Sequence, residues 1–103
     1  MQTTRSKNNI PIRLTDERWL HITEEHSEMA GYYFDVLEAV ANPQIIYAGK
    51  YGELIACIET DPGKYLLVVY KETNSNDGFI VTAFFTKRTQ QLEKREIVWK
   101  RSI

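Results

Sequence analysis

Two histidines, His21 and His26, are the side chains in this sequence best suited to proton transfer. They stand five residues apart in the segment HITEEH. The unperturbed pKa of imidazole lies near neutral pH, so histidine can act as a general acid or a general base. On one continuous helix this spacing would place them about 140° apart, but a helix that ends at Glu25 would let His26 turn toward His21. The alternative interpretation is that each histidine is a surface or capping imidazole.

No metal site or cofactor site is expected. A zinc-protease helix needs two histidines four residues apart with a glutamate after the first, and here Ile22 follows His21. The five glycines are scattered among turns, so they form no phosphate-cradling or dinucleotide-binding loop. The single cysteine, Cys57, lies within an apolar run and is expected to be a small buried hydrophobic residue.

Cations and a hydroxyl are expected where the predicted strands end. If they converge beside the histidines, they could hold a phosphodiester, orient a 2′-hydroxyl and stabilise a pentavalent transition state. Three aromatic side chains could stack on bases, namely Tyr51, Tyr70 and Trp99. The alternative is that the lysines are ordinary solubilising or edge-guarding residues. The strand-end residues are Lys50 after the first strand, Lys71 at the end of the third, and Thr86, Lys87 and Arg88 at the end of the fourth.

Two helices are predicted in the N-terminal part of the chain. Thr15 is a suitable N-cap for the first, because two carboxylates follow it in the first turn, and this helix is expected to end near Glu25 or His26. The helical spacing of apolar residues predicts a second helix over residues 27–41. Asn42–Pro43 should end it, because the residue before a proline is pushed out of the helical region.

The rest of the chain is predicted to form strands. Strong turn signals separate them at Asp61-Pro62-Gly63 and at Asn76-Asp77-Gly78. Consecutive strands joined by short turns must pair antiparallel, since parallel pairing needs a crossover. The predicted strands cover residues 44–49, 53–59, 64–71 and 79–86, with residues 97–99 as a candidate fifth strand.

This order of elements predicts an α+β fold in which two N-terminal helices pack on one face of a four-stranded antiparallel sheet, or a five-stranded one. The opposite face of the sheet would then be open to a ligand or a partner. At 103 residues the chain has room for one domain. Residues 1–9 are polar and are expected to be a flexible arm, and residues 10–103 are expected to form the domain.

The charge is distributed unevenly, although the net charge is only −1. Residues 1–14 carry +3, residues 15–63 carry −8 and residues 64–103 carry +4. The basic C-terminal part could hold an RNA backbone or an acidic protein partner, and the alternative is random surface scatter. One cysteine, no secretory signal and no apolar stretch near the ~20 residues of a membrane helix predict a cytoplasmic protein without a membrane partner.

Three segments resemble a known group of nucleases. They read LTDERWLHITEEHSE, IYAGKYGELIA and GFIVTAFFTKR. They are similar to the helix, hairpin and closing-strand motifs of phage- and bacterium-associated nucleases in the barnase–EndoU–colicin–RelE superfamily. The similarity spans roughly residues 10–99, and its first block is the most specific. One departure is Ser27, which stands where these nucleases usually have a proline after the second histidine.

The resemblance implies a metal-independent ribonuclease fold, often a toxin that a small antitoxin protein neutralises. The leading hypothesis is therefore an endoribonuclease that cleaves RNA by histidine-assisted attack of the 2′-hydroxyl. The alternatives are a non-catalytic module that binds RNA or protein on the open sheet face and basic tail, or an enzyme acting on a small molecule. The catalytic candidates are His21, His26, Lys50 and Thr86, and the substrate-binding candidates are Lys71, Lys87, Arg88 and Tyr70.

Overall fold

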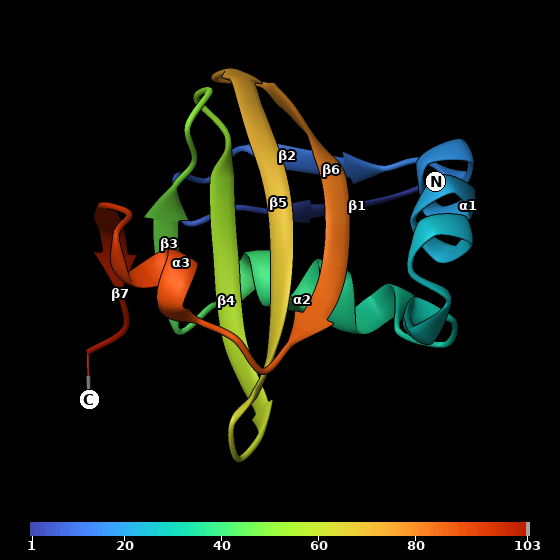
Figure 1. Cartoon of the computed structure of the whole chain (residues 1–103). Coiled ribbons are helices and arrows are strands. Elements are labelled where there is room, and N and C mark those ends of the chain that lie inside the picture. The colour runs from blue at the N-terminus through green and yellow to red at the C-terminus, as the bar shows by residue number, and fades with distance from the viewer. Residues whose placement is uncertain (103) are drawn as a thin grey trace.

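Seven strands among the described residues form one mixed sheet in the order β1-β2-β6-β5-β4-β3-β7 (Figure 1). The computed structural model describes residues 1–102, so the last residue of the predicted domain lies outside it. The strands combine with three α-helices, which confirms the α+β class. The elements are β1 (Gln2–Arg5), β2 (Pro11–Leu14), α1 (Asp16–Glu25), the 3-10 turn η1 (Ser27–Met29), α2 (Tyr33–Ala41), β3 (Ile45–Ala48), β4 (Leu54–Asp61), β5 (Lys64–Asn74), β6 (Asp77–Thr86), α3 (Gln90–Glu93) and β7 (Ile97–Lys100).

Helix α1 begins and ends where the sequence predicts. The side chain of Thr15 caps it by accepting a hydrogen bond of 3.1 Å from the backbone N–H of Arg18. His26 is the C-cap, and its φ of −132° takes the backbone out of the helical region. The imidazole of His26 can therefore point in a direction that a continued helix would not allow.

The predicted second helix is shorter than expected. A single helix over residues 27–41 is wrong, because the segment forms the 3-10 turn η1 and then α2, which begins only at Tyr33. Gly31 lies between them at a φ of +90°, in the left-handed region that interrupts a right-handed helix. Helix α2 ends at Ala41, before Pro43, as expected.

The four predicted strands are present as β3 to β6, and each pairs antiparallel with the next. The prediction of a purely antiparallel four-stranded sheet is nevertheless wrong. Strand β7 is the candidate fifth strand and adds to β3 antiparallel, but β2 adds to β6 in parallel at the single pair Arg13 and Phe79. Strand β1 lies within the segment expected to be an arm and pairs antiparallel with β2. Ser6 and Asn8, in the loop after β1, donate hydrogen bonds to the Glu72 carboxylate on β5, which ties this hairpin to the sheet.

The two faces of the sheet differ in how they are covered. Figure 1 shows α2 behind the strands, α1 beside β6, and the short α3 in front. The hairpin of β1 and β2 crosses behind β4, β5 and β6, so the main core is enclosed on the α2 side. On the other face α3 is the helix that adds cover within residues 1–102, through Leu92, which packs with Ile55, Cys57 and Leu67. That second face is the open face of the sheet, and its large remaining area is available to a ligand. The main core consists of Ile12, Leu14, Ile22, Met29, Val36, Leu37, Ala39, Val40, Ala56, Leu66, Val68, Tyr70, Ile80 and Ala83.

Strong curvature brings the ends of the sheet together. The ammonium group of Lys7, in the loop after β1, lies 5.2 Å from the ring centroid of Trp99 on β7. These residues flank opposite ends of the strand order, so the sheet curls until its first hairpin meets its last strand. Within residues 1–102, no helix has the length and apolar character needed to cross a membrane.

Candidate functional site

A groove of about 870 Å³ lies on the open face of the sheet, and we call it the sheet groove. Strands β4, β5 and β6 form its floor with apolar side chains, and α3 contributes the wall that contains Leu92. Its volume falls within the range of pockets that hold small ligands. The floor residues are Ile55, Leu67, Val69, Val81, Phe79 and Phe84.

A bulge in β6 explains why both phenylalanines reach the sheet groove. Side chains alternate between the two faces of a regular strand, so residues 79 and 84 would normally point to opposite faces. Here Val69 pairs with Thr82 and Tyr70 pairs with Ile80, which leaves Val81 as one extra residue in β6. The extra residue reverses the alternation, so Phe79, Val81 and Phe84 all line the sheet groove.

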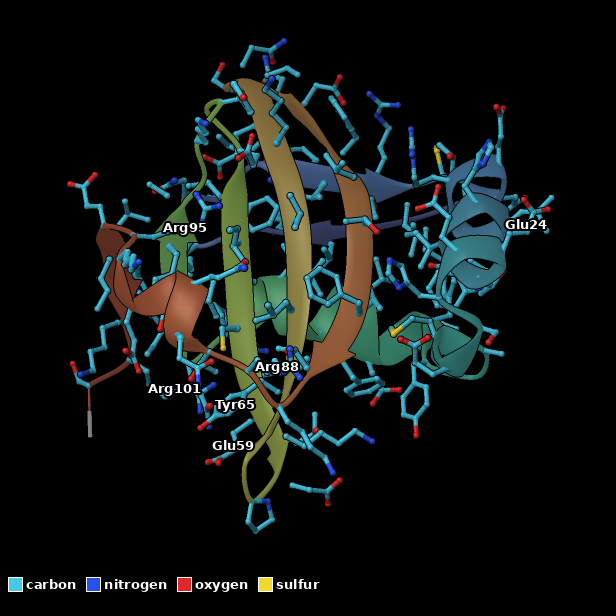
Figure 2. The ribbon with its side chains drawn as sticks, in the orientation of Figure 1. Glu24, Glu59, Tyr65, Arg88, Arg95 and Arg101 are labelled. Atoms are coloured by element: carbon cyan, nitrogen blue, oxygen red, sulfur yellow. The ribbon has the colours of Figure 1, made fainter. Side chains whose placement is uncertain are left out.

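Three cations line the sheet groove, namely Lys71, Arg88 and Arg95. None of them forms an ion pair with an acid elsewhere in residues 1–102. In Figure 2, Arg88 lies near the lower ends of the central strands and Arg95 lies on the side of α3 and β7. Unpaired cations around an apolar floor suit a ligand that combines flat rings with negative charges.

Thr86 holds the segment that carries Arg88. Its hydroxyl accepts a hydrogen bond of 3.0 Å from the backbone N–H of Arg88 and donates one of 3.2 Å to the Arg88 carbonyl. Lys71, Thr86 and Arg88, three of the residues that the sequence singled out, all line the sheet groove, with Lys71 toward one end and Thr86 and Arg88 toward the other. In this geometry the hydroxyl of Thr86 positions Arg88.

Glu53 is a carboxylate of the sheet groove that the sequence interpretation missed. Its side chain accepts a hydrogen bond of 3.3 Å from the backbone N–H of Tyr51. This bond, helped by the charge of Arg95, lowers the pKa of the Glu53 carboxyl below its ordinary value. The sequence signal that could have identified Glu53 is its position directly after the Tyr51–Gly52 turn, from which its side chain can reach back to the backbone of that turn. Glu53 adds one fixed negative charge to a groove that otherwise carries cations.

His26 lies against the side of the sheet groove. Its imidazole stacks on the ring of Phe84 with the centroids 5.5 Å apart and the planes inclined by 29°. Its Nδ1 lies 3.9 Å from a carboxylate oxygen of Glu28, a partner for the ring when it is protonated. The C-cap position at the end of α1 thus places an imidazole on an aromatic ring that lines the groove.

His21 lines a second cavity of about 310 Å³, which we call the α1 cavity. The two histidines therefore have different surroundings. Phe79, however, lines both the α1 cavity and the sheet groove, so the cavities are neighbours across β6. The remaining residues of the α1 cavity are Arg13, Thr15, Glu17, Arg18 and Ile80.

The other predicted site residues lie outside both cavities. Tyr70 is wrong as a base-stacking residue, because it is 0% exposed and belongs to the core on the α2 side. Burial raises the pKa of its hydroxyl, which has no hydrogen-bond partner within residues 1–102. Lys50 and Lys87 are exposed and line neither cavity, although the Lys50 ammonium lies 5.6 Å from the ring centroid of Tyr51, a groove residue. Trp99 likewise lies outside them.

No three His, Cys, Asp or Glu side chains within residues 1–102 cluster as metal ligands would. We found no match to the chain among protein-family models, curated proteins or solved structures. The assignment of three segments to a nuclease superfamily therefore stays a prediction, and function has to be inferred from the two cavities themselves.

Proposed function

We propose that this protein is a metal-independent endoribonuclease that binds RNA in the sheet groove. The observation that supports this function best is the sheet groove itself. It combines the aromatic rings of Tyr51, Phe79 and Phe84 with three cations that form no ion pair within residues 1–102. Bases stack on aromatic rings and phosphates bind cations, so single-stranded RNA matches both parts of the groove.

The proposed reaction is attack of a ribose 2′-hydroxyl on the adjacent phosphorus. A general base takes the hydroxyl proton as the new P–O bond forms, and a general acid protonates the departing 5′-oxygen. The products are a 2′,3′-cyclic phosphate end and a 5′-hydroxyl end. We assign one of these proton transfers to His26, which is in contact with the groove residue Phe84. His21 would carry out the other from the α1 cavity. Lys71 and Arg88, which lie toward opposite ends of the sheet groove, would stabilise the charges of different phosphates of the same RNA.

A toxin neutralised by a small antitoxin is the biological role that we propose for this activity. The cations of the sheet groove would attract an acidic antitoxin segment as well as RNA. Such a segment would occupy the RNA site and block it. The buried free thiol of Cys57 is compatible with the reducing cytoplasm, where we expect such a pair to act.

A non-catalytic RNA- or protein-binding module is the second candidate. The observation that favours it is the separation of the histidines, since His21 lines the α1 cavity whereas His26 contacts Phe84. In this role the sheet groove would hold its ligand without cleaving it. Tight, salt-dependent binding without cleavage products would identify this function.

Incubation of the purified protein with a long single-stranded RNA in EDTA tests both candidates. The parent, His26→Ala, His21→Ala and the matched control Arg5→Ala would be compared on a denaturing gel, with binding measured in parallel. Parallel lanes with translating ribosomes cover a nuclease that needs them. Cyclic-phosphate fragments from the parent and Arg5→Ala, but not from the histidine variants, are the expected result. Binding without fragments in every lane would favour the module, and neither binding nor fragments would contradict both functions.

A further inference from the structure

Three side chains form a row across the open face at the β2 side of the sheet groove. Arg13 on β2 pairs with Phe79 on β6, and Phe79 pairs with Lys71 on β5. Neighbouring strands lie about 4.8 Å apart, so each cation stands one strand away from the aromatic ring. The row therefore places an aromatic residue between two positive charges, on adjacent strands of one sheet.

The α1 cavity supplies further polar groups at the Arg13 end of this row. Arg18 and His21 line it on the α1 side, and Phe79 separates it from the sheet groove. Arg18 is exposed and forms no ion pair with an acid in residues 1–102. A negatively charged group in the α1 cavity would therefore meet the unpaired guanidinium of Arg18 and the imidazole of His21, with the carboxylate of Glu17 as the one acidic side chain among the lining residues.

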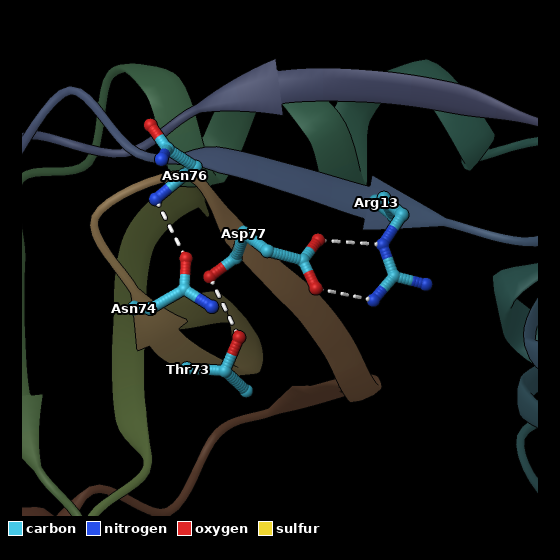
Figure 3. Close-up of polar contacts among 5 residues, drawn as sticks. All are labelled: Arg13, Thr73, Asn74, Asn76 and Asp77. Atoms are coloured by element: carbon cyan, nitrogen blue, oxygen red, sulfur yellow. Dashed lines mark hydrogen bonds and ion pairs between the residues drawn. The ribbon is translucent and has the colours of Figure 1, made fainter.

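The guanidinium of Arg13 is held in place by a neighbouring carboxylate. Its guanidinium donates two hydrogen bonds, of 2.8 and 2.9 Å, to the carboxylate of Asp77 (Figure 3). The backbone carbonyl of Asp77 in turn accepts a bond of 2.9 Å from the hydroxyl of Thr73, which fixes the β5–β6 turn. Asp77 offsets part of the charge of Arg13, so Arg18 is the stronger candidate for binding an anion.

We propose that single-stranded RNA crosses β6 at Phe79 and occupies both cavities at once. One base stacks on Phe79, the phosphate on the sheet-groove side binds Lys71, and the phosphate on the other side binds Arg18, which leaves the imidazole of His21 beside the RNA for proton transfer. This path rests on the proposed RNA-binding function, and it adds the direction in which the RNA runs across the protein surface. The path also explains how two histidines in different surroundings can act on the same RNA, because the RNA chain that passes Phe79 runs beside both cavities.

The salt dependence of binding tests this path. The probe is a fluorescein-labelled uridine hexanucleotide with 2′-O-methyl groups, which cannot be cleaved through the 2′-oxygen, and the readout is fluorescence anisotropy. Each phosphate contact on single-stranded nucleic acid contributes about 0.7 to the slope of log affinity against log salt. Arg18→Ala should therefore reduce that slope by about 0.7, whereas Arg5→Ala, an exposed cation on β1, should leave it unchanged.

The stacking step is tested with variants of Phe79. Phe79→Ala should weaken binding of the hexanucleotide by about 5-fold to 150-fold, the range for loss of one base–aromatic stack. Phe79→Leu keeps more of the packing and should still lose most of this affinity, and circular dichroism would show whether each variant is folded. If the parent binds the probe and Arg18→Ala keeps the full slope, the path across β6 is wrong while the sheet groove stands as the RNA site. If the parent does not bind the probe, the proposed function fails.

Discussion

The imidazole of His26 stacks on the phenyl ring of Phe84, with the ring centroids 5.5 Å apart. This contact joins the end of α1 to the part of β6 that lines the sheet groove. His26 therefore has two separable properties. Its ring packs on Phe84, and its nitrogens can transfer a proton.

Two substitutions of His26 should separate these properties. His26→Phe can retain the stacked ring without an ionisable nitrogen, whereas His26→Ala loses both. We expect both variants to lose RNA cleavage. Only His26→Ala should also lose about 0.5–1.5 kcal/mol of unfolding free energy, the usual contribution of an aromatic pair, as measured by urea denaturation. Cleavage by His26→Phe at the parental rate would show that His26 has no catalytic role.

Tyr70→Phe should stabilise the protein. The hydroxyl of Tyr70 is buried and has no hydrogen-bond partner within residues 1–102, and such an unpaired group costs about 1–3 kcal/mol. We expect the variant to gain about 1 kcal/mol in urea denaturation, because the ring keeps its packing and only the unpaired oxygen is removed. RNA affinity should not change. Lower affinity in this variant would contradict the placement of the RNA on the opposite face.

The position of Tyr70 shows why a sequence pattern predicts that a strand exists more readily than it predicts which face of the sheet each side chain lies on. The segment KYLLVVYK is apolar at consecutive positions, so it predicts a strand buried on both sides without showing which side is open. In the structure Tyr70 faces the core and Lys71 faces the sheet groove. Phe84 was overlooked for a related reason, since the bulge at Val81 that turns it toward the groove has no distinct sequence signal.

Local signals were enough for some elements and not for others. Thr15 caps α1 through its own hydroxyl, and Pro43 restricts its own neighbour, so the sequence places both boundaries well. The apolar residues 97–99 likewise indicated β7, which forms over Ile97–Lys100. Strand β1 was not predicted from its polar sequence, and it forms because β2 offers it a pairing partner. Thr86 and Arg88 were predictable as strand-end residues, whereas Lys71 lies inside β5, which continues to Asn74. Arg95 and Glu53 join them in the sheet groove only through the tertiary position of α3 and of the β3–β4 turn.

Asp77→Asn should reveal a pH-dependent part of the stability. Hydrogen bonds from Arg13 lower the pKa of the Asp77 carboxyl below its ordinary value of 3.8. As the pH falls, the unfolded chain therefore binds this proton before the folded protein does. The stabilisation is complete above the ordinary pKa and is lost as the pH falls through the lower pKa of the folded state.

The variant should accordingly melt at a lower temperature than the parent at neutral pH, and the difference should shrink below about pH 4. The matched control is Asp61→Asn at the exposed β4–β5 turn, where the side chain forms no ion pair in residues 1–102. A difference between Asp77→Asn and the parent that is constant with pH would show that the ion pair is not its source.

Gly78→Ala should be far more destabilising than Gly49→Ala. A Cβ at Gly78 would collide with the backbone carbonyl of Lys71 and with Ile12 in the core, and neither can move freely. Overpacking of this kind costs about 1–3 kcal/mol. A Cβ at Gly49 would meet only the flexible side chain of Glu53, so urea denaturation should show a smaller loss there. Equal losses at the two positions would mean that the backbone at residue 78 relaxes.

Labelling of Cys57 should report on how firmly α3 covers the open face. Its thiol is buried beside Leu92, and burial raises the pKa of Cys57 to about 11, so little reactive thiolate is present in the folded protein. We expect a thiol reagent such as Ellman's reagent to react slowly with the parent at mildly alkaline pH and quickly in denaturant. Leu92→Ala should accelerate labelling of the folded protein several-fold, because Leu92 is the one buried side chain of α3.

Glu93→Ala on the exposed side of the same helix is the control and should label like the parent. Because α3 also forms a wall of the sheet groove, Leu92→Ala should weaken RNA binding in proportion to its effect on labelling. Fast labelling of Leu92→Ala with parental RNA affinity would separate the two roles. The sheet strands alone would then hold the ligand, without help from α3.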